Sequence, residues 1–179
     1  MIHLLSYRWC RWVFVLLIAG WSSMAVGQNV NYKSQSLYIY QFTKYITWPA
    51  EARTGDFVIG VYGNCPIQKD LELMAALKRA GSGQKIVVKH IRSLDELDGL
   101  HVLYLASSKS RDLRSILERL EGKPTLVVAE RGGLAKKGAC INFITLDNDS
   151  LRFEINTDTM KAHQLVMAEE LLKRGYIVH

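Results

Sequence analysis

Short apolar runs rich in β-forming residues alternate with helical stretches along this chain, and this alternation constrains its fold more than any other feature. Four runs are expected to be strands: 56–62, 85–91, 101–106 and 125–129. They lack the strict polar–apolar alternation of a half-solvated strand, so each is expected to be buried on both faces. Strands separated by helices in this way predict a mainly parallel sheet covered by helices on both sides.

The expected helices carry apolar side chains at helical spacing. In the first, over 31–47, Tyr38, Phe42 and Tyr45 form one stripe. Trp48-Pro49 ends this helix because the residue before a proline avoids helical angles. Trp48 is expected to pack at the helix end, with the anchoring of a partner as the alternative. Two further helical stripes follow along the chain: Leu71, Met74, Ala75 and Leu77, and then Leu113, Ile116, Leu117 and Leu120.

The C-terminal part is expected to close the sheet with a hairpin and a final helix. Runs 139–145 and 151–156 form the hairpin across the turn residues 147–149. Asn156 is expected to cap the last helix. Four residues would form its buried stripe: Leu165, Ala168, Leu171 and Leu172. The whole pattern predicts a single α/β domain of three layers, with a mainly parallel sheet, a C-terminal antiparallel hairpin and helices on both faces.

The segment 1–27 has the three parts of a secretory signal peptide. Arg8 and Arg11 supply the basic start, 13–19 is the apolar centre, and 25–27 carries small residues, so we expect cleavage before Gln28. An uncleaved membrane anchor is the alternative, but the apolar run of about ten residues is half of the ~20 that a span needs. The expected organisation is therefore a signal peptide over 1–27 and one domain over 28–179, exported to the periplasm.

The net charge of +6 would suit a nucleic-acid-binding protein, but its distribution does not. The two arginines of the leader carry part of it. The remaining basic residues are dispersed, mixed with acidic ones and not interleaved with aromatic side chains. Export removes the nucleic-acid partner as well, so we expect none, while an anionic membrane or an acidic partner domain stays open.

Candidate binding residues follow the strands, because ligands of open α/β sheets bind beyond the carboxyl ends of the strands. Five residues of these loops are the candidates for a ligand site: Gly63, Asn64, Ser107, Ser108 and Arg131. Glycine lets a ligand approach the backbone, the serines offer hydroxyls, and the arginine can clamp an anion. Ordinary turn geometry is the alternative, since the chain has neither a full dinucleotide fingerprint nor a phosphate loop with its lysine.

Patterns typical of catalysis or metal binding are missing from the sequence. No histidine has the spacing or the cysteine neighbours of a metal site, and no serine has the nucleophile-elbow pattern. We therefore expect no metal, no cofactor and no enzymatic activity, with an uncharacterised hydrolase as the weakest alternative. His101 opens a strand and is expected to lie at the edge of the core. In an oxidising compartment Cys65 and Cys140 either form a disulfide or remain buried thiols, and their spacing does not decide between the two.

Several segments taken together resemble the YfiR/HmsC-like family of periplasmic regulators. The segments that carry the resemblance are 38–49, an aromatic helix closed by Lys-Tyr-x-x-Trp-Pro; the strands 57–63 and 103–105; 138–143, which is similar to Gly-x-x-Ile-Asn-Phe; and 151–156, followed later by Glu169-Glu170-Leu171-Leu172. Their order and spacing are more specific than any one of them. The resemblance covers about residues 32–175, which is nearly the whole of the expected domain.

The resemblance implies a function through protein binding. Members of the family repress an inner-membrane diguanylate cyclase by binding its periplasmic sensor domain. An OmpA-like outer-membrane lipoprotein can sequester the repressor, which releases cyclic-di-GMP synthesis and promotes biofilm formation. The implied protein is a periplasmic signalling regulator that shifts the cyclase toward its inactive state. The alternative is a periplasmic small-molecule binding module that uses the crevice at the carboxyl ends of the strands.

The chain departs from the family pattern in its cysteines. Many relatives carry a cysteine just before the third strand, where this chain has Leu100, so the resemblance implies no partner for Cys65 there. Redox control through disulfides is associated with some members of the family, and in this chain only a bridge between Cys65 and Cys140 would provide it. For partner binding we expect the solvent-facing parts of the first and last helices, and a homodimer is compatible with the sequence.

Overall fold

A seven-stranded sheet runs through the protein, and the computed structural model describes it within residues 31–179. The expected signal peptide and its cleavage site lie outside these residues. The strand order is β3-β2-β4-β5-β6-β7-β9. The strands are β2 (Phe57–Tyr62), β3 (Ile86–Ile91), β4 (Val102–Leu105), β5 (Leu126–Ala129), β6 (Ile141–Thr145), β7 (Leu151–Asn156) and β9 (Tyr176–Val178).

The pairing of these strands is mainly parallel. From β3 to β6 every neighbouring pair is parallel, and β6 with β7 forms the antiparallel hairpin. The last strand, β9, then adds to β7 in parallel at the edge of the sheet. The central strands β4 and β5 are buried at every position, which agrees with their uninterrupted apolar sequence.

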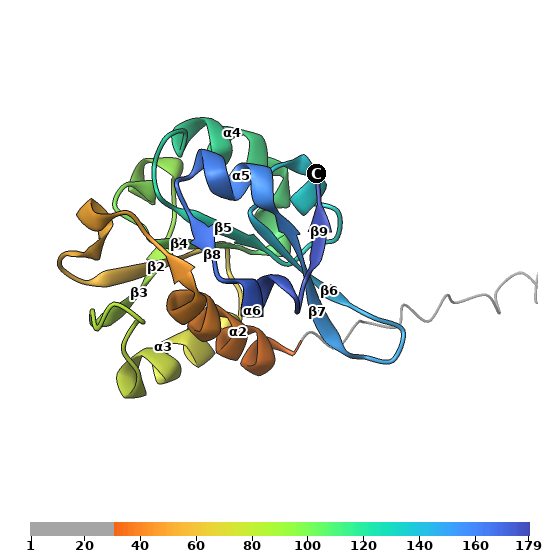
Figure 1. The fold of residues 1–179 in the computed structure, drawn as a ribbon, viewed down its shortest axis with the longest axis horizontal. Coiled ribbons are helices and arrows are strands. Elements are labelled where there is room, and N and C mark those ends of the chain that lie inside the picture. The colour runs from red at the N-terminus through yellow and green to blue at the C-terminus, as the bar shows by residue number, and fades with distance from the viewer. Residues whose placement is uncertain (1–30) are drawn as a thin grey trace, which may run out of the picture. The chain divides into compact units, whose positions relative to one another are not determined.

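Helices cover both faces of the sheet, so the chain has the predicted α/β architecture of three layers. In Figure 1, α2 and α3 lie on one face and α4 and α5 on the other. The helices are α2 (Tyr32–Tyr45), α3 (Ile67–Leu77), α4 (Leu113–Arg119), α5 (Thr157–Ala162) and α6 (Glu169–Leu172), and the 3-10 turns are η1 (Ala50–Arg53), η2 (Leu94–Leu97), η3 (Ser107–Asp112) and η4 (Ala135–Lys137). Within residues 31–179, no helix combines the length and the apolar character needed to cross a bilayer.

Aromatic side chains hold α2 against the sheet. Phe42 is fully buried and meets Phe153 edge to face, with ring centroids 5.3 Å apart, and Phe143 at 6.0 Å. Beyond the helix, Trp48 is buried and stands edge-on to Phe57 at 4.9 Å. Such aromatic pairs stabilise a core beyond the burial of their area. Trp48 therefore has the packing role that its position predicted.

The single last helix predicted after Asn156 is wrong. Asn156 does cap a helix, because its side chain accepts a hydrogen bond from the backbone N–H of Thr159 at 2.9 Å, but α5 is only six residues long. Gln164 then has a φ of 58°, a left-handed conformation that cannot continue a right-handed helix. The next residues form β8 (Val166–Met167), which pairs antiparallel with β1 (Ile46–Thr47) in a separate two-stranded sheet.

Candidate functional site

The loops after β2 and β4 pack directly against each other at the carboxyl edge of the sheet. Gly63 has a φ of 102°, and a Cβ placed on it would lie 2.9 Å from the Cβ of Ala106 and 3.1 Å from the Oγ of Ser108. Only glycine fits this contact without a shift of its neighbours. The structure thus brings the loops of Gly63, Ser107 and Ser108 together, but protein atoms fill the space that a ligand would need beside Gly63. Asn64 is exposed next to this contact.

A carboxylate joins the loops after β4 and β5. Glu130 accepts hydrogen bonds from the backbone N–H of Ser107 at 2.5 Å and from the hydroxyl of Tyr104 at 2.7 Å. Hydrogen bonds to an ionised carboxylate are shorter and stronger than neutral ones. Sequence reasoning chose Arg131 in this loop and missed Glu130, although an acid directly after a buried strand is a usable signal.

Tyr104 is the centre of a buried polar cluster under the start of α2. Besides its bond to Glu130, its hydroxyl lies 2.7 Å from the side-chain oxygen of Gln35. A phenol has one proton, so the two acceptors share it. Burial and, after it, the charge of Glu130 raise the pKa of Tyr104 far above its ordinary value, which keeps the hydroxyl protonated.

Cys65 and Tyr32 extend this cluster. Burial is the main cause that raises the pKa of the Cys65 thiol, and the Glu130 charge adds to it. The pKa of Tyr32 is raised as well, first by burial and then by its contact with Cys65. A protonated thiol is a poor nucleophile and a poor metal ligand. These groups are therefore suited to fixing α2 over the strand ends and not to covalent chemistry.

A pocket of about 320 Å³ lies at the same edge of the sheet, and its lining includes the predicted residue Arg131. The Nη1 of Arg131 donates a hydrogen bond to the Oγ of Ser110 at 2.9 Å, and Ser110 is buried. Three further cationic residues line the pocket: Arg111, Arg114 and Lys137. The structure therefore separates the sequence candidates, with Arg131 at an open pocket and the loops of Gly63 and Ser108 in a closed contact.

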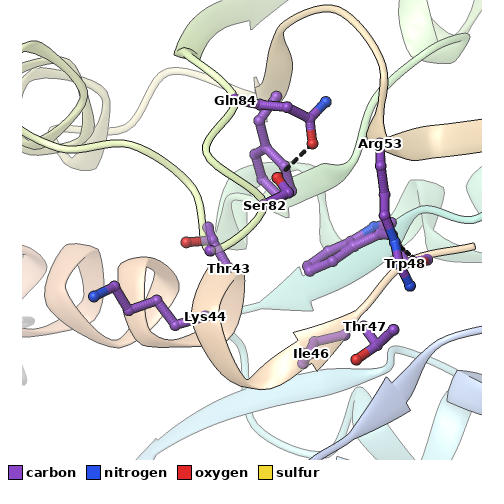
Figure 2. A pocket seen from close by; sticks show the side chains of 10 residues that line it. Thr43, Lys44, Ile46, Thr47, Trp48, Arg53, Ser82 and Gln84 are labelled. Carbon is purple, nitrogen blue, oxygen red and sulfur yellow. Dashed lines mark hydrogen bonds between the residues drawn. The ribbon is translucent and has the colours of Figure 1, made fainter. Parts of the chain in front are cut away.

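A second pocket, of about 200 Å³, lies at the end of α2 (Figure 2). Trp48 and Arg53 line one part of it, and the loop with Ser82 and Gln84 lines another. The Nε of Arg53 donates to the Trp48 carbonyl at 2.8 Å. The indole N–H of Trp48 is buried and has no partner among the described residues. An unpaired buried donor costs about 1–3 kcal/mol unless solvent satisfies it. Sequence reasoning did not find this pocket, because its walls come from three separate segments.

Within residues 31–179, Cys65 and Cys140 do not form a bridge, and both are free and buried. Cys65 follows β2 and Cys140 precedes β6, with β4 and β5 between them. Three strand spacings of about 4.8 Å put the two at least roughly 14 Å apart across the sheet. A disulfide tolerates a Cα separation of only about 7 Å. Of the two states left open by the sequence, the structure therefore shows the two buried thiols. Complete burial raises the pKa of the Cys140 thiol to about 12.

His101 has the structural position expected from its place in the sequence. Its Nδ1 accepts a hydrogen bond from the backbone N–H of Val58 at 3.1 Å, and its Nε2 donates to the Ala52 carbonyl at 2.6 Å. These two partners fix the neutral tautomer. Desolvation lowers the pKa of the ring. Residues 31–179 contain no group of three or more histidine, cysteine or acidic side chains placed to hold a metal ion.

Comparison with known proteins gives one informative match. The sequence model of the YfiR/HmsC-like family matches residues 32–175. No curated protein matches the chain. Among solved structures, the ABC domain in complex with L-Trp from Streptococcus pneumonia is similar at 9% sequence identity and a TM-score of 0.49, over 68% of this chain. The chain spans only 55% of the length of that structure, and a likeness at this level says nothing about a ligand.

Proposed function

Because the chain belongs to the YfiR/HmsC-like family, whose sequence model matches residues 32–175, we propose that it is a periplasmic regulator of a diguanylate cyclase. It acts in this proposal by binding the periplasmic sensor domain of an inner-membrane cyclase and holding it in an inactive state. The family match carries the proposal, since the family is periplasmic and its members are regulators rather than enzymes.

The chemistry of the strand ends is consistent with binding rather than catalysis. Tyr104 and Glu130 are bonded to each other, and burial keeps the Cys65 thiol protonated. These groups hold α2 firmly on the sheet, because they connect it to the ends of β4 and β5. A helix fixed in this way presents a constant outer surface, which lowers the entropy cost of binding a partner.

Exposed apolar side chains on α2 and α3 offer such a partner a surface. Leu37 and Tyr45 on α2 are 55% and 41% exposed, and Leu73 and Leu77 on α3 are 59% and 81% exposed. The two helices cover the same face of the sheet (Figure 1). In this proposal they contribute to one apolar contact surface, since contiguous exposed apolar patches mark interaction surfaces. The proposed interface therefore keeps the first helix expected from the sequence and replaces the last helix, which the structure breaks up, with α3.

Release of the cyclase is proposed to come from an OmpA-like outer-membrane lipoprotein. If this lipoprotein and the cyclase compete for the regulator, sequestration reduces the population of inhibited cyclase. The freed cyclase would then make cyclic-di-GMP and promote biofilm formation. No change in the cyclase itself is required, because mass action on the shared regulator is sufficient.

Deletion of the gene in a strain that retains the cyclase tests this proposal. We expect cyclic-di-GMP and surface attachment to rise, because the inhibitor is gone. The full chain should restore both, whereas a chain that starts at Gln28 with an initiating Met should not, since it lacks the leader that would export it. Unchanged cyclic-di-GMP in a deletion strain with an active cyclase would contradict the proposal.

A further inference from the structure

Four cationic residues line the pocket of about 320 Å³ at the carboxyl edge of the sheet. Arg111 lies on η3 and Arg114 on α4. Arg131 lies in the loop after β5, and Lys137 on η4. Among the described residues, no carboxylate lines this pocket. Within residues 31–179, Arg114 is alone among the four in forming an ion pair, with the exposed Glu118 at 3.0 Å. The pocket therefore carries a surplus of positive charge.

All four cationic residues are solvent-exposed, so water and salt screen the repulsion among them. Their like charges still face one common space, where an anion would be attracted by several of them at once. Two of the walls here are the buried apolar residues Leu113 and Leu134. This attraction would be greatest for an anion with two charges.

Arg131 is prepared for an anion before any ligand arrives. Its Nη1 donates to Ser110, and that serine is only 6% exposed, so the guanidinium is tethered to the body of the fold. Its remaining N–H groups have no partner within residues 31–179 and can form the paired hydrogen bonds that a guanidinium makes to phosphate oxygens. A tethered arginine loses less side-chain entropy on binding than a mobile one.

We propose that this pocket binds the phosphate group of a small phosphomonoester. The dianion of a phosphomonoester matches the surplus charge, and its three terminal oxygens are acceptors for the guanidinium and ammonium groups that line the pocket. A volume of about 320 Å³ is at the lower end for small-molecule sites, so the phosphate and a compact organic remainder fill it. This inference is independent of the proposed function, because it requires no cyclase.

Isothermal titration of the purified protein with phenyl phosphate and inorganic phosphate tests this inference. We expect saturable binding of both probes. Lys137→Gln should weaken it by about tenfold or more, because a charge-assisted hydrogen bond is lost. The matched control is Lys136→Gln, which removes the same charge from the neighbouring residue of η4 that does not line the pocket. The control should bind within about twofold of the parent protein.

Arg131→Lys provides a second variant that keeps the charge. It should also weaken binding, since a lysine cannot make paired hydrogen bonds. Absence of saturable binding of either probe at millimolar concentration would overturn the proposal. Equal losses in Lys136→Gln and Lys137→Gln would overturn it as well, because they would indicate diffuse charge attraction. Binding to phosphatidylglycerol vesicles alone would instead assign the basic residues to lipid headgroups and also overturn it.

Discussion

The hydroxyl of Tyr104 donates a 2.7 Å hydrogen bond to the carboxylate of Glu130. This bond connects strand β4 to the loop that follows β5. The same hydroxyl reaches Gln35 on α2, and the same carboxylate accepts the N–H of Ser107. One buried phenol and one acid therefore hold a helix and two loops in place. These groups are the structural support of the edge at which the candidate pocket lies.

Tyr104→Phe should lower the free energy of unfolding by about 1–3 kcal/mol, because Gln35 and Glu130 lose their shared partner in a buried place. Urea unfolding measures the change. The control is Tyr45→Phe. Because Tyr45 is exposed, this substitution should change the free energy of unfolding by no more than about 0.5 kcal/mol. Equal stability of the two variants would show that the cluster does not support the edge.

Gly63→Ala should destabilise the protein more than Gly99→Ala. Both glycines have positive φ, 102° and 75°, so both substitutions carry a backbone cost of about 1–2 kcal/mol. Only at Gly63 does the new Cβ also meet Ala106 at 2.9 Å, while nothing lies within 4 Å at Gly99. The added overlap should cost about 1–3 kcal/mol more. Identical midpoints of thermal unfolding for both variants would contradict the tight contact between the two loops.

Stability should fall as the pH drops below about 6.5, and His101 should contribute to the fall. Its pKa is lowered in the folded state by desolvation, so above pH 6.5 both states are neutral. Below that pH the unfolded chain takes up the proton first, and folding loses stability until the folded-state pKa is reached. Protonation would also place a proton on Nδ1 opposite the N–H of Val58.

Urea unfolding between about pH 7.5 and 5 measures this dependence. His101→Gln should reduce the slope of stability against pH, while the exposed His90→Gln should keep the slope of the parent protein. If both variants keep the same slope, the proton uptake belongs to other groups.

The two thiols should be unreactive in the native protein. Cys65 and Cys140 are buried, and the pKa of each thiol is raised, chiefly by burial, so little thiolate is present at neutral pH. Alkylation followed by mass spectrometry should find both labelled after denaturation without reductant and neither labelled before it. A mature protein that is lighter by two hydrogens and resists labelling in denaturant would show that a disulfide forms after all.

The sheet could be predicted from sequence because its strands are apolar runs with few competing patterns. The runs at 101–106 and 125–129 correspond to β4 and β5, which are buried on both faces. The hairpin of β6 and β7 was equally readable, because Asp147-Asn148-Asp149 separates two β-forming runs. In these elements the local sequence favours a strand and the burial in the folded protein favours one too. Long-range contacts therefore did not change the structure that the local sequence predicts.

The last helix could not be predicted correctly from the spacing of its apolar residues. Leu165, Leu171 and Leu172 fit a helix, but His163, Leu165 and Met167 are buried while their neighbours Gln164 and Val166 are exposed, which is the period of a strand. The pairing of β8 with β1, distant in sequence, decided between the two patterns. The edge strand β9 was not predicted either, although Tyr176-Ile177-Val178 are β-forming residues that follow a glycine.

The candidate site was predicted only in its location. The rule that ligands bind beyond the carboxyl ends of strands led to the loops after β2, β4 and β5. Which of them is open depends on side-chain packing, and Gly63 against Ser108 closes one while Arg131 lines a pocket. The basic residues that complete this pocket are separated by up to 26 positions in the chain, from Arg111 to Lys137, so their convergence depends on the folded sheet.

The exposed leucines of α3 provide a test of the proposed interface with the cyclase. Leu73→Ser combined with Leu77→Ser should weaken the complex with a cyclase by about tenfold or more, because exposed apolar anchors lose their contacts. Val166→Ser is the matched control, since Val166 is 66% exposed but lies on β8. All three side chains are exposed, so the fold should tolerate each change.

The most direct test of the account is the affinity of the protein for the periplasmic sensor domain of the cyclase from the same organism, measured by titration of the purified partners. The account predicts saturable binding that Leu73→Ser/Leu77→Ser weakens and Val166→Ser does not. Absence of a complex between the unmodified partners at micromolar concentration would contradict it.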